Sequence, residues 1–381
     1  MRVNNAPKKD YYEAKYDEKC DFKKWLEEEL WKAYRLARRG KRKTEDEHRF
    51  EANDLENLRR LHDDIIKHQY KPSRGIAFLI SRPVIREIFA APFRDRIVHH
   101  FLYNVSAKWW DRQFINDSYS CRNNKGTLYG QRRLLHFIRQ TSHNNPKEKV
   151  FVAKLDLQGY FMSLSRKRLY EAICEGLDKQ FKNNKGKLYK LVKYLWKEVI
   201  FDDPTEGVKI RGNPKCWKKL PHSKSLFAQP KGRGIVIGNL TSQLLSNIYL
   251  NKLDRFATQN LGYKCYGRYV DDFFIVVPLS EKEQLLRDIK VIERFLKEEL
   301  KLTLHPKKRT FRTANQGIPF LGAVIYMNHI VPGRRIKHNT RQAFRRRAIG
   351  IDNEESITSY EGHLKHINSK KFLKGLHEKY F

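Results

Sequence analysis

Two adjacent aspartates in a run of strand-forming residues, between positions 267 and 277, constrain the fold of this 381-residue chain more than any other feature. Asp271 and Asp272 follow Tyr269 and precede the apolar run 273–277. This pattern predicts a β-hairpin with the acidic pair at its bend. Buried carboxylates are costly to desolvate unless a cation meets them, and Mg²⁺ suits them because it binds one or two protein carboxylates together with water or phosphate oxygens. A solvated Asp-Asp turn is the alternative on these residues alone.

A second acidic strand end lies upstream of this hairpin. Asp156 closes the apolar run 150–155. Two-metal phosphoryl transfer needs carboxylates from separate strands that hold the two ions about 4 Å apart. Asp156 and Asp271 together predict such a site, whereas the alternative makes Asp156 a turn or N-cap residue at a strand end.

The chain is strongly basic. Its 78 Lys and Arg residues against 43 Asp and Glu residues give a formal net charge of +35. Such an excess predicts a polyanionic partner, with an affinity that falls as salt rises because binding releases counterions from nucleic acid. A membrane is the competing partner for a basic protein, but no apolar run approaches the roughly 18 residues that a transmembrane helix requires.

The N-terminal sequence and the cysteines bear on the cellular compartment. Met1–Asp10 has no apolar core and does not predict a secretory signal, so we expect a cytoplasmic location. The cysteines are odd in number, widely spaced and without a Cys-x-x-Cys pair, which argues against a disulfide framework or a zinc site. They are Cys20, Cys121, Cys174, Cys216 and Cys265.

In its ordered motifs the chain resembles the reverse transcriptases. Tyr269-Val270-Asp271-Asp272 resembles their palm signature, and Asp156 followed by Phe161 resembles their first catalytic strand with its sugar-sensing aromatic. Further segments resemble, in the same order along the chain, the fingers, the segment under the incoming nucleotide and the primer grip. These segments are residues 86–100, 118–127, 237–250 and 320–322.

The resemblance implies a role for each matching residue. The implied catalytic residues are Asp156, Asp271 and Asp272. The implied ligands of two Mg²⁺ ions, for which Mn²⁺ would be a substitute, are Asp156, Leu157, Asp271 and Asp272. The implied residues for binding deoxynucleoside triphosphates are Arg82, Arg86, Phe161, Ile237, Gly238, Gln243 and Tyr269. The implied primer- and template-binding residues are Phe320, Leu321, Gly322, Arg334, Arg335 and Arg341.

One departure from the family pattern indicates which group of reverse transcriptases the chain resembles most. Most reverse transcriptases carry Gln-Gly where this chain has Ile237-Gly238, followed by Thr241-Ser242-Gln243. This variant is typical of the enzymes of diversity-generating retroelements, bacterial and phage systems that copy a template RNA with frequent errors at adenine. Related enzymes serve group II introns, retrons and antiphage defence. Loss of a polar amide beside the nascent base pair predicts relaxed fidelity, since a contact that is not made cannot discriminate.

The resemblance also implies partners. They are a template RNA, the RNA/DNA duplex made from it, and an accessory protein that depends on the system. The alternative biological role is antiphage defence, in which the enzyme copies a non-coding RNA.

We therefore expect an α+β fold of the right-hand polymerase type, with fingers, a palm built on an antiparallel sheet and a short basic thumb. The expected regions are an N-terminal helical extension (1–72), fingers (73–149), a palm (150–328) with fingers insertions and an irregular segment (201–234), and a thumb (329–381).

Local patterns predict four further details. Apolar residues at helical spacing predict a first helix over 22–37. Thr241 would cap the helix that follows it, and Ser280 with Glu283 would form a capping box. Alternation over 301–304 predicts another palm strand.

Overall fold

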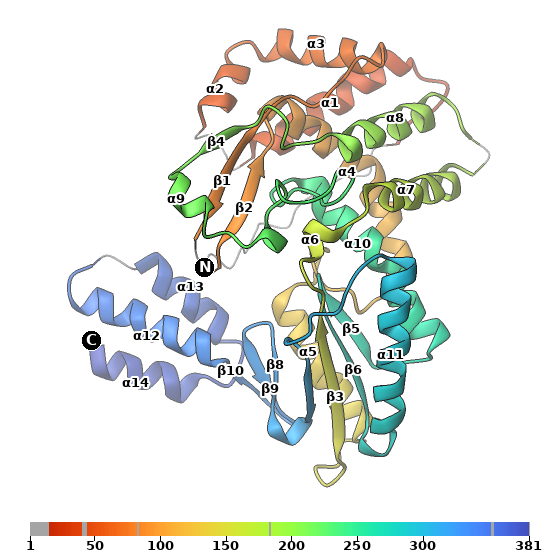
Figure 1. Cartoon of the computed structure of the whole chain (residues 1–381). Coiled ribbons are helices and arrows are strands. Elements are labelled where there is room, and N and C mark those ends of the chain that lie inside the picture. The colour runs from red at the N-terminus through yellow and green to blue at the C-terminus, as the bar shows by residue number, and fades with distance from the viewer. Residues whose placement is uncertain (1–14, 40–43, 82–83, 183, 352–353, 381) are drawn as a thin grey trace.

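The computed structural model describes residues 15–39, 44–81, 84–182, 184–351 and 354–380. Its centre is a four-stranded antiparallel sheet in the order β5-β6-β3-β7 (Figure 1). The strands are β3 Val150–Asp156, β5 Tyr266–Tyr269, β6 Asp272–Pro278 and β7 Thr310–Thr313. β3 pairs with β6 along its whole length, from Val150 opposite Pro278 to Asp156 opposite Asp272. The predicted hairpin with an acidic bend is confirmed.

The two faces of this sheet pack into different cores because side chains alternate along a strand. Leu155 and Phe273 belong to the larger core, which also contains residues of α10 and α11. Val152 and Phe274 belong to the second core, which α5 covers. The helices are α5 Thr127–Thr141, α10 Leu240–Arg255 and α11 Lys282–Glu299. Helices and an antiparallel sheet in this arrangement confirm the α+β prediction.

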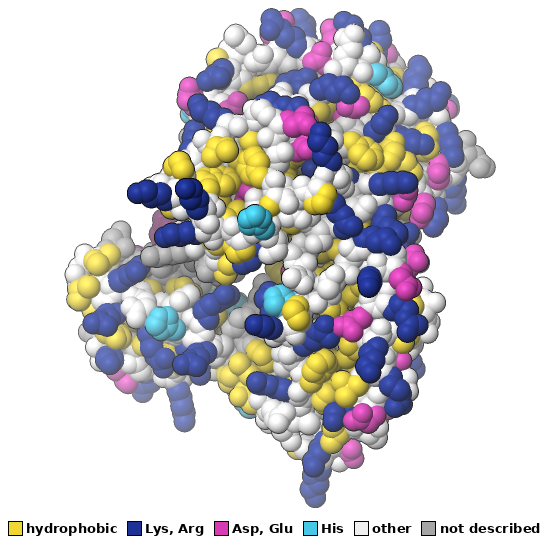
Figure 2. Space-filling model, viewed as in Figure 1, with side chains coloured by type: hydrophobic (Ala, Val, Ile, Leu, Met, Phe, Trp, Pro, Cys, Tyr) yellow, Lys and Arg dark blue, Asp and Glu magenta, His cyan; other side chains and the backbone are white. Residues whose placement is uncertain are grey.

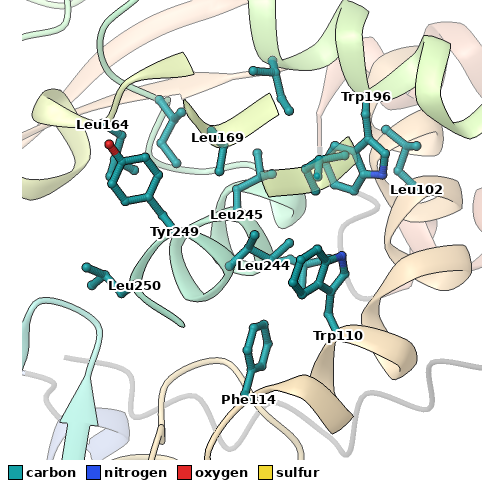
Figure 3. Packing of buried hydrophobic residues seen from close by; sticks show 14 of the residues in the cluster. Leu102, Trp110, Phe114, Leu164, Leu169, Trp196, Leu244, Leu245, Tyr249 and Leu250 are labelled. Carbon is teal, nitrogen blue, oxygen red and sulfur yellow. The ribbon is translucent and has the colours of Figure 1, made fainter. Parts of the chain in front are cut away.

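Helix α10 joins the palm sheet to the helices around it. Leu244, Leu245 and Tyr249 are buried on α10, and the cluster around them includes Trp110 and Trp196 (Figure 3). These two tryptophans come from α4 and α8, and the neighbouring helices are α4 Phe93–Gln113, α6 Tyr160–Ser163, α7 Arg166–Phe181 and α8 Lys187–Phe201. Burial of each leucine contributes about 1.5–3 kcal/mol, so this cluster fixes the floor of the palm.

The N-terminal extension is helical, as predicted. It consists of α1 Phe22–Arg38, α2 Glu45–Glu51 and α3 Asp54–Ile66. Asp21 caps α1 by accepting a bond from the Lys23 amide at 3.0 Å, which confirms the first predicted helix. Leu26 and Leu30 of α1 are fully buried in the larger core, so the extension packs on the rest of the chain.

A second sheet contains the fingers strands and part of the segment predicted to be irregular. Its strands are β1 Ile76–Ile80, β2 Arg86–Ala90 and β4 Lys209–Arg211. β4 pairs parallel to β1, and α9 Pro214–Trp217 and the 3₁₀ turn η1 His222–Lys224 follow it. The carboxylate of Glu87, fully buried on β2, accepts bonds from Ser225 Oγ at 2.9 Å and the Leu226 amide at 2.6 Å. The segment 201–234 is therefore partly regular and anchored, because a buried carboxylate supplies acceptors for its backbone.

The C-terminal region begins with a small sheet and ends in three helices (Figure 1). The elements are β8 Ile318–Phe320, β9 Ala323–Ile325, β10 Ile330–Pro332, α12 Arg334–Ala348, α13 Glu354–Leu364 and α14 Lys370–Tyr380. β10 pairs with β9, so the proposed palm–thumb boundary at 328/329 falls inside this sheet. Phe344 of α12 lies in a separate apolar cluster with residues of α13 and α14.

Three local predictions are wrong. Asn239 is the N-cap residue of α10, and the Thr241 hydroxyl instead meets His99 Nδ1 at 2.9 Å. Glu281 is the N-cap residue of α11, because Leu279–Glu281 forms a 3₁₀ turn (η3) where the capping box was expected. Leu304 forms an isolated bridge with Leu157, and the fourth palm strand is β7.

Two other short elements complete the chain, the π-helix η2 Phe256–Asn260 and the 3₁₀ turn η4 Ala314–Gln316. Among the helices that the structure describes, none is long and apolar enough to span a membrane.

Glu87→Ala should release the segment that Glu87 anchors. The substitution leaves the Leu226 amide and the Ser225 hydroxyl without their acceptor, so we expect a loss of about 2–3 kcal/mol in the free energy of unfolding. Faster proteolysis between residues 215 and 231, detected by mass spectrometry, would report the release. Glu56→Ala, which removes an exposed ion pair with Arg60, is the control and should change neither quantity appreciably. Unchanged cleavage in Glu87→Ala would contradict the anchoring role.

Candidate active site

The turn between β5 and β6 holds the acidic pair under backbone strain. Val270 has φ +56°, a left-handed conformation that is unusual for a β-branched residue. Such a conformation costs about 1–2 kcal/mol for an L-residue. The Leu157 amide donates to the Asp271 carbonyl at 3.3 Å, which ties this turn to the end of β3. Strand pairing and this bond together bring Asp156 and Asp271 to the same end of the sheet.

Burial and neighbouring negative charge raise the pKa values of two carboxylates at this end, Asp271 and Asp156. Burial, followed by the charges of Asp156 and Asp272, raises the pKa of Asp271 from 3.8 to about 6. Burial and Asp272 also raise the pKa of Asp156, although Lys308 and Lys154 partly offset the effect. The site is therefore short of positive charge.

Two lysines partly neutralise this site. Lys308 Nζ lies 3.1 and 3.2 Å from the two carboxylate oxygens of Asp156. Lys154 Nζ lies 3.1 Å from Asp272 Oδ1. The sequence marks neither lysine, because Lys308 follows a segment wrongly predicted as a strand and nothing local to Lys154 indicates its cross-strand partner.

The oxygen donors at this site fit a divalent metal whose coordination is completed by oxygens of the substrate. Asp156 and Asp271 offer hard carboxylate oxygens, and Leu157, whose side chain is buried in the core, has its carbonyl oxygen to offer. Asp272 pairs with Lys154, and the described part of the chain holds no group of three His, Cys, Asp or Glu side chains arranged for one metal. This set agrees with Mg²⁺, which takes one or two carboxylates from the protein and phosphate oxygens from its substrate.

The segments predicted to bind the nucleotide lie between this site and the fingers strands. Phe161 is on α6, with its ring centroid 5.2 Å from that of Tyr160, and its carbonyl accepts a bond from the Ile235 amide at 3.0 Å. The Ile237 carbonyl accepts a bond from the Phe89 amide at 3.3 Å, which joins this segment to β2. A Cβ on the next residue, Gly238, would lie 3.0 Å from the Phe89 carbonyl oxygen.

The other residues predicted to bind the nucleotide differ in how exposed their side chains are. Gln243 on α10 and Tyr269 at the end of β5 are half-buried, and Arg86 is exposed at the start of β2. Arg82 lies outside the described residues.

The predicted primer grip is a tight hairpin turn that packs against the hairpin of β5 and β6. Leu321 and Gly322 between β8 and β9 have φ values of +49° and +84°, as a two-residue turn of type I′ requires. Phe320 is buried with its ring centroid 5.1 Å from that of Phe274 on β6. Gln131 Nε2, on α5, donates to the Leu321 carbonyl at 2.9 Å. Gln131 was not predicted from the sequence, because nothing local distinguishes it from any other helical glutamine.

The predicted thumb arginines line an exposed helix face. Arg334 and Arg341 lie on one face of α12 with Arg345, and Arg335 is exposed beside them. The Arg341 guanidinium stacks over the Phe372 ring at 5.2 Å. Figure 2 shows Lys and Arg side chains over the lobe of the C-terminal helices and a hollow between this lobe and the rest of the molecule. A surface of this charge suits phosphate backbones.

Comparison with known proteins gives one family match. Residues 86–325 match the family model described as "Reverse transcriptase (RNA-dependent DNA polymerase)". Protein YkfC of Escherichia coli (strain K12) is 22% identical over 298 residues, which cover 70% of this chain and 70% of that protein.

Solved structures similar to this chain include telomerases. Apo telomerase from Candida tropicalis has a TM-score of 0.46 at 12% identity, covering 69% of this chain and 49% of that one. Telomerase from Candida albicans in complex with a TWJ fragment of telomeric RNA has a TM-score of 0.44 at 13% identity, covering 83% of this chain and 57% of that one. The chain thus spans about half the length of the telomerase chains.

Asp271→Asn should stabilise the metal-free protein at neutral and alkaline pH. The pKa of Asp271 is raised in the folded state, so ionisation of this one group lowers the free energy of unfolding of the wild type as pH rises from about 4 to about 6. Above pH 6 the loss reaches about 3 kcal/mol, since each pKa unit corresponds to 1.36 kcal/mol. The neutral amide of asparagine does not ionise and does not cause this loss. Thermal melts in EDTA at pH 4 and pH 8 measure the difference.

We expect a higher melting temperature for Asp271→Asn at pH 8 and little difference at pH 4. Glu28→Gln, which changes an exposed carboxylate on α1, is the control and should leave the melting temperature unchanged at both pH values. A variant no more stable than wild type at pH 8 would contradict the electrostatic account.

Proposed function

Because the chain belongs to the reverse transcriptase family, we propose that it copies a dedicated template RNA into DNA with Asp156 and Asp271 as its central catalytic carboxylates. The enzyme class is RNA-directed DNA polymerase. The observation that supports the assignment of residues is the pairing of β3 with β6, because it sets Asp156 opposite Asp272, next to the turn that contains Asp271.

In the proposed reaction, the primer 3′-hydroxyl attacks the α-phosphate of a deoxynucleoside triphosphate and pyrophosphate leaves. Mg²⁺ bound at the carboxylates would lower the pKa of that hydroxyl and stabilise the charge of the leaving group. Asp156 and Asp271 supply the carboxylate oxygens that hold the metal. Asp272, held by Lys154, orients the turn. Lys308 neutralises Asp156 and so limits the repulsion between the two central carboxylates.

Other parts of the chain bind and orient the substrates in this proposal. Phe161 excludes the 2′-hydroxyl of a ribonucleotide by shape, and Arg86 binds the triphosphate because a planar guanidinium matches phosphate oxygens. The turn at Leu321 and Gly322 holds the primer end. The arginine face of α12 binds the phosphates of the RNA/DNA duplex without reading sequence.

We propose that synthesis is error-prone, as in diversity-generating retroelements. The Ile237 side chain packs on the apolar cluster of Ala77, Phe89 and Met162, and it carries no amide that could bond the nascent base pair. A site with fewer polar contacts to a base pair discriminates less between correct and incorrect pairs. An accessory protein encoded with the enzyme belongs to this proposal. Antiphage defence with a non-coding RNA template is the alternative.

Primer extension on an RNA template tests the proposal. With Mg²⁺ and deoxynucleoside triphosphates, the wild type should make cDNA, and Asp271→Ala/Asp272→Ala should lower the rate by about 10³-fold or more because the metal loses its ligands. The matched control is Asp202→Ala/Asp203→Ala, a second aspartate pair, of which Asp202 binds Arg74 on the fingers side. It should retain synthesis.

Sequencing the cDNA separates the two biological roles. Errors concentrated at template adenines support the retroelement role, whereas faithful or repetitive cDNA supports defence. Equal synthesis by both double variants would refute the catalytic assignment.

Phe161→Ala should admit ribonucleotides. Removing the ring opens space for a 2′-hydroxyl, so we expect the preference for deoxynucleotides in kcat/KM to fall by about tenfold or more, equivalent to about 1.4 kcal/mol. Steady-state rates with dATP and ATP on the same template measure it. Tyr160→Phe, which keeps the neighbouring ring and loses only the two bonds between its hydroxyl and Ser246, is the control. An unchanged preference in Phe161→Ala would refute the role of Phe161.

A further inference from the structure

A buried arginine lies directly behind the catalytic turn. Arg268 is on β5 opposite Phe273 of β6, and its side chain is fully buried. Its backbone is also fixed, because its amide donates to the Asp117 carbonyl at 2.8 Å and its carbonyl accepts from the Tyr119 amide at 2.9 Å. A buried guanidinium is costly to desolvate unless its donors are fully paired. The mechanism described above makes no use of this residue.

The guanidinium of Arg268 has five N–H donors, and five acceptor atoms surround it. Nε and Nη2 bind the two carboxylate oxygens of Asp254 at 2.7 Å each, in a forked pair. The other acceptors are Ser118 Oγ at 3.2 Å, Asn247 Oδ1 at 3.4 Å and the Val270 carbonyl at 2.9 Å. Asp254 is fully buried too and accepts a further bond from the Tyr266 hydroxyl at 2.7 Å. These contacts leave the guanidinium a single orientation.

The bond to the Val270 carbonyl acts on the strained residue that precedes Asp271. A β-branched residue holds a left-handed conformation only where surrounding bonds maintain it. Two bonds do so here, from Arg268 Nη1 to the Val270 carbonyl and from the Leu157 amide to the Asp271 carbonyl. The first comes from Arg268, which is held by residues of α10, and the second comes from the residue that follows β3.

We propose that Arg268 is a positioning residue that, held by Asp254, fixes the catalytic turn and so places Asp271 beside Asp156 for metal binding. This inference rests on the proposed function in assigning those two carboxylates to the metal. A lysine at position 268 would keep the positive charge, but it cannot bind both oxygens of Asp254 and reach Val270 in one fixed geometry. The substitution Arg268→Lys therefore separates the effect of the positive charge from the effect of the guanidinium geometry.

The test compares Arg268→Lys with the wild type in two measurements. Calorimetric titration of the substrate-free protein with Mn²⁺ measures metal affinity directly. Primer extension over a range of Mg²⁺ concentrations, normalised to the enzyme bound to primer–template, measures kcat and the KM for dNTP. We expect the Mn²⁺ dissociation constant to rise and kcat to fall, each by about tenfold, as for other residues that orient a metal ligand. The KM for dNTP should stay within about twofold, since the nucleotide contacts are unchanged.

Arg94→Lys is the matched control. Arg94 bonds Asp64 and Asp95, which joins α3 to α4 away from the catalytic turn. This variant should lower the melting temperature and leave Mn²⁺ affinity at the wild-type value. A lower melting temperature with unchanged Mn²⁺ affinity in Arg268→Lys as well would mean that Arg268 has a structural role only, and the inference would be overturned.

A milder variant covers the case in which Arg268→Lys does not fold. Ser118→Ala removes one of the five acceptors and keeps the pair with Asp254. It should weaken Mn²⁺ binding in the same direction by about twofold, and an unchanged affinity would overturn the inference. Wild-type protein that binds Mn²⁺ but makes no cDNA would refute the proposed function, while the Mn²⁺ titrations would still decide the role of Arg268.

Discussion

The pairing of β3 with β6 is the constraint on which the rest of the molecule depends. It sets Asp156 directly opposite Asp272 and brings Asp271 to the same end of the sheet, so the fold forces three carboxylates together. Burial, followed by the charges of Asp156 and Asp272, raises the pKa of Asp271, and Lys308 offsets the effect only in part. The folded chain thus holds an unfavourable charge distribution that a bound divalent cation would relieve. Catalytic sites often combine burial and like charges in this way.

Two strained turns, each held by buried hydrogen bonds, lie in the hairpins around the three carboxylates. Val270 adopts a left-handed conformation beside the carboxylates, and Leu321 does so in the predicted primer grip. The two hairpins share one core through the contact between Phe274 and Phe320, so neither can shift independently of the other. Strain of this kind persists because buried bonds, such as those of Gln131 and Arg268, determine the backbone around it.

Local sequence patterns predicted well those elements whose residues alternate or repeat along one segment. The strand that ends at Asp156, the hairpin bend at Asp271 and the helix after Asp21 all follow from neighbouring residues. The errors arose where a competing tertiary contact was decisive. Thr241 could cap a helix by its chemistry, but its hydroxyl bonds the buried, neutral His99, whose pKa burial lowers to about 4. The segment 201–234 read as irregular because its anchor, Glu87, lies more than a hundred residues upstream.

The sequence by itself determined the strand that Asp156 ends, the hairpin bend that holds the acidic pair, the excess of positive charge and the order of the motifs, because periodicity and composition are properties of neighbouring residues. Only the tertiary structure decided that Asp272 pairs with Lys154, that Lys308 reaches Asp156, and that Arg268 lies buried against Asp254 behind the catalytic turn. The reason is physical. Hydrogen bonds, burial and charge–charge interactions depend on distances through space, and those distances are fixed only when segments far apart in the chain pack together.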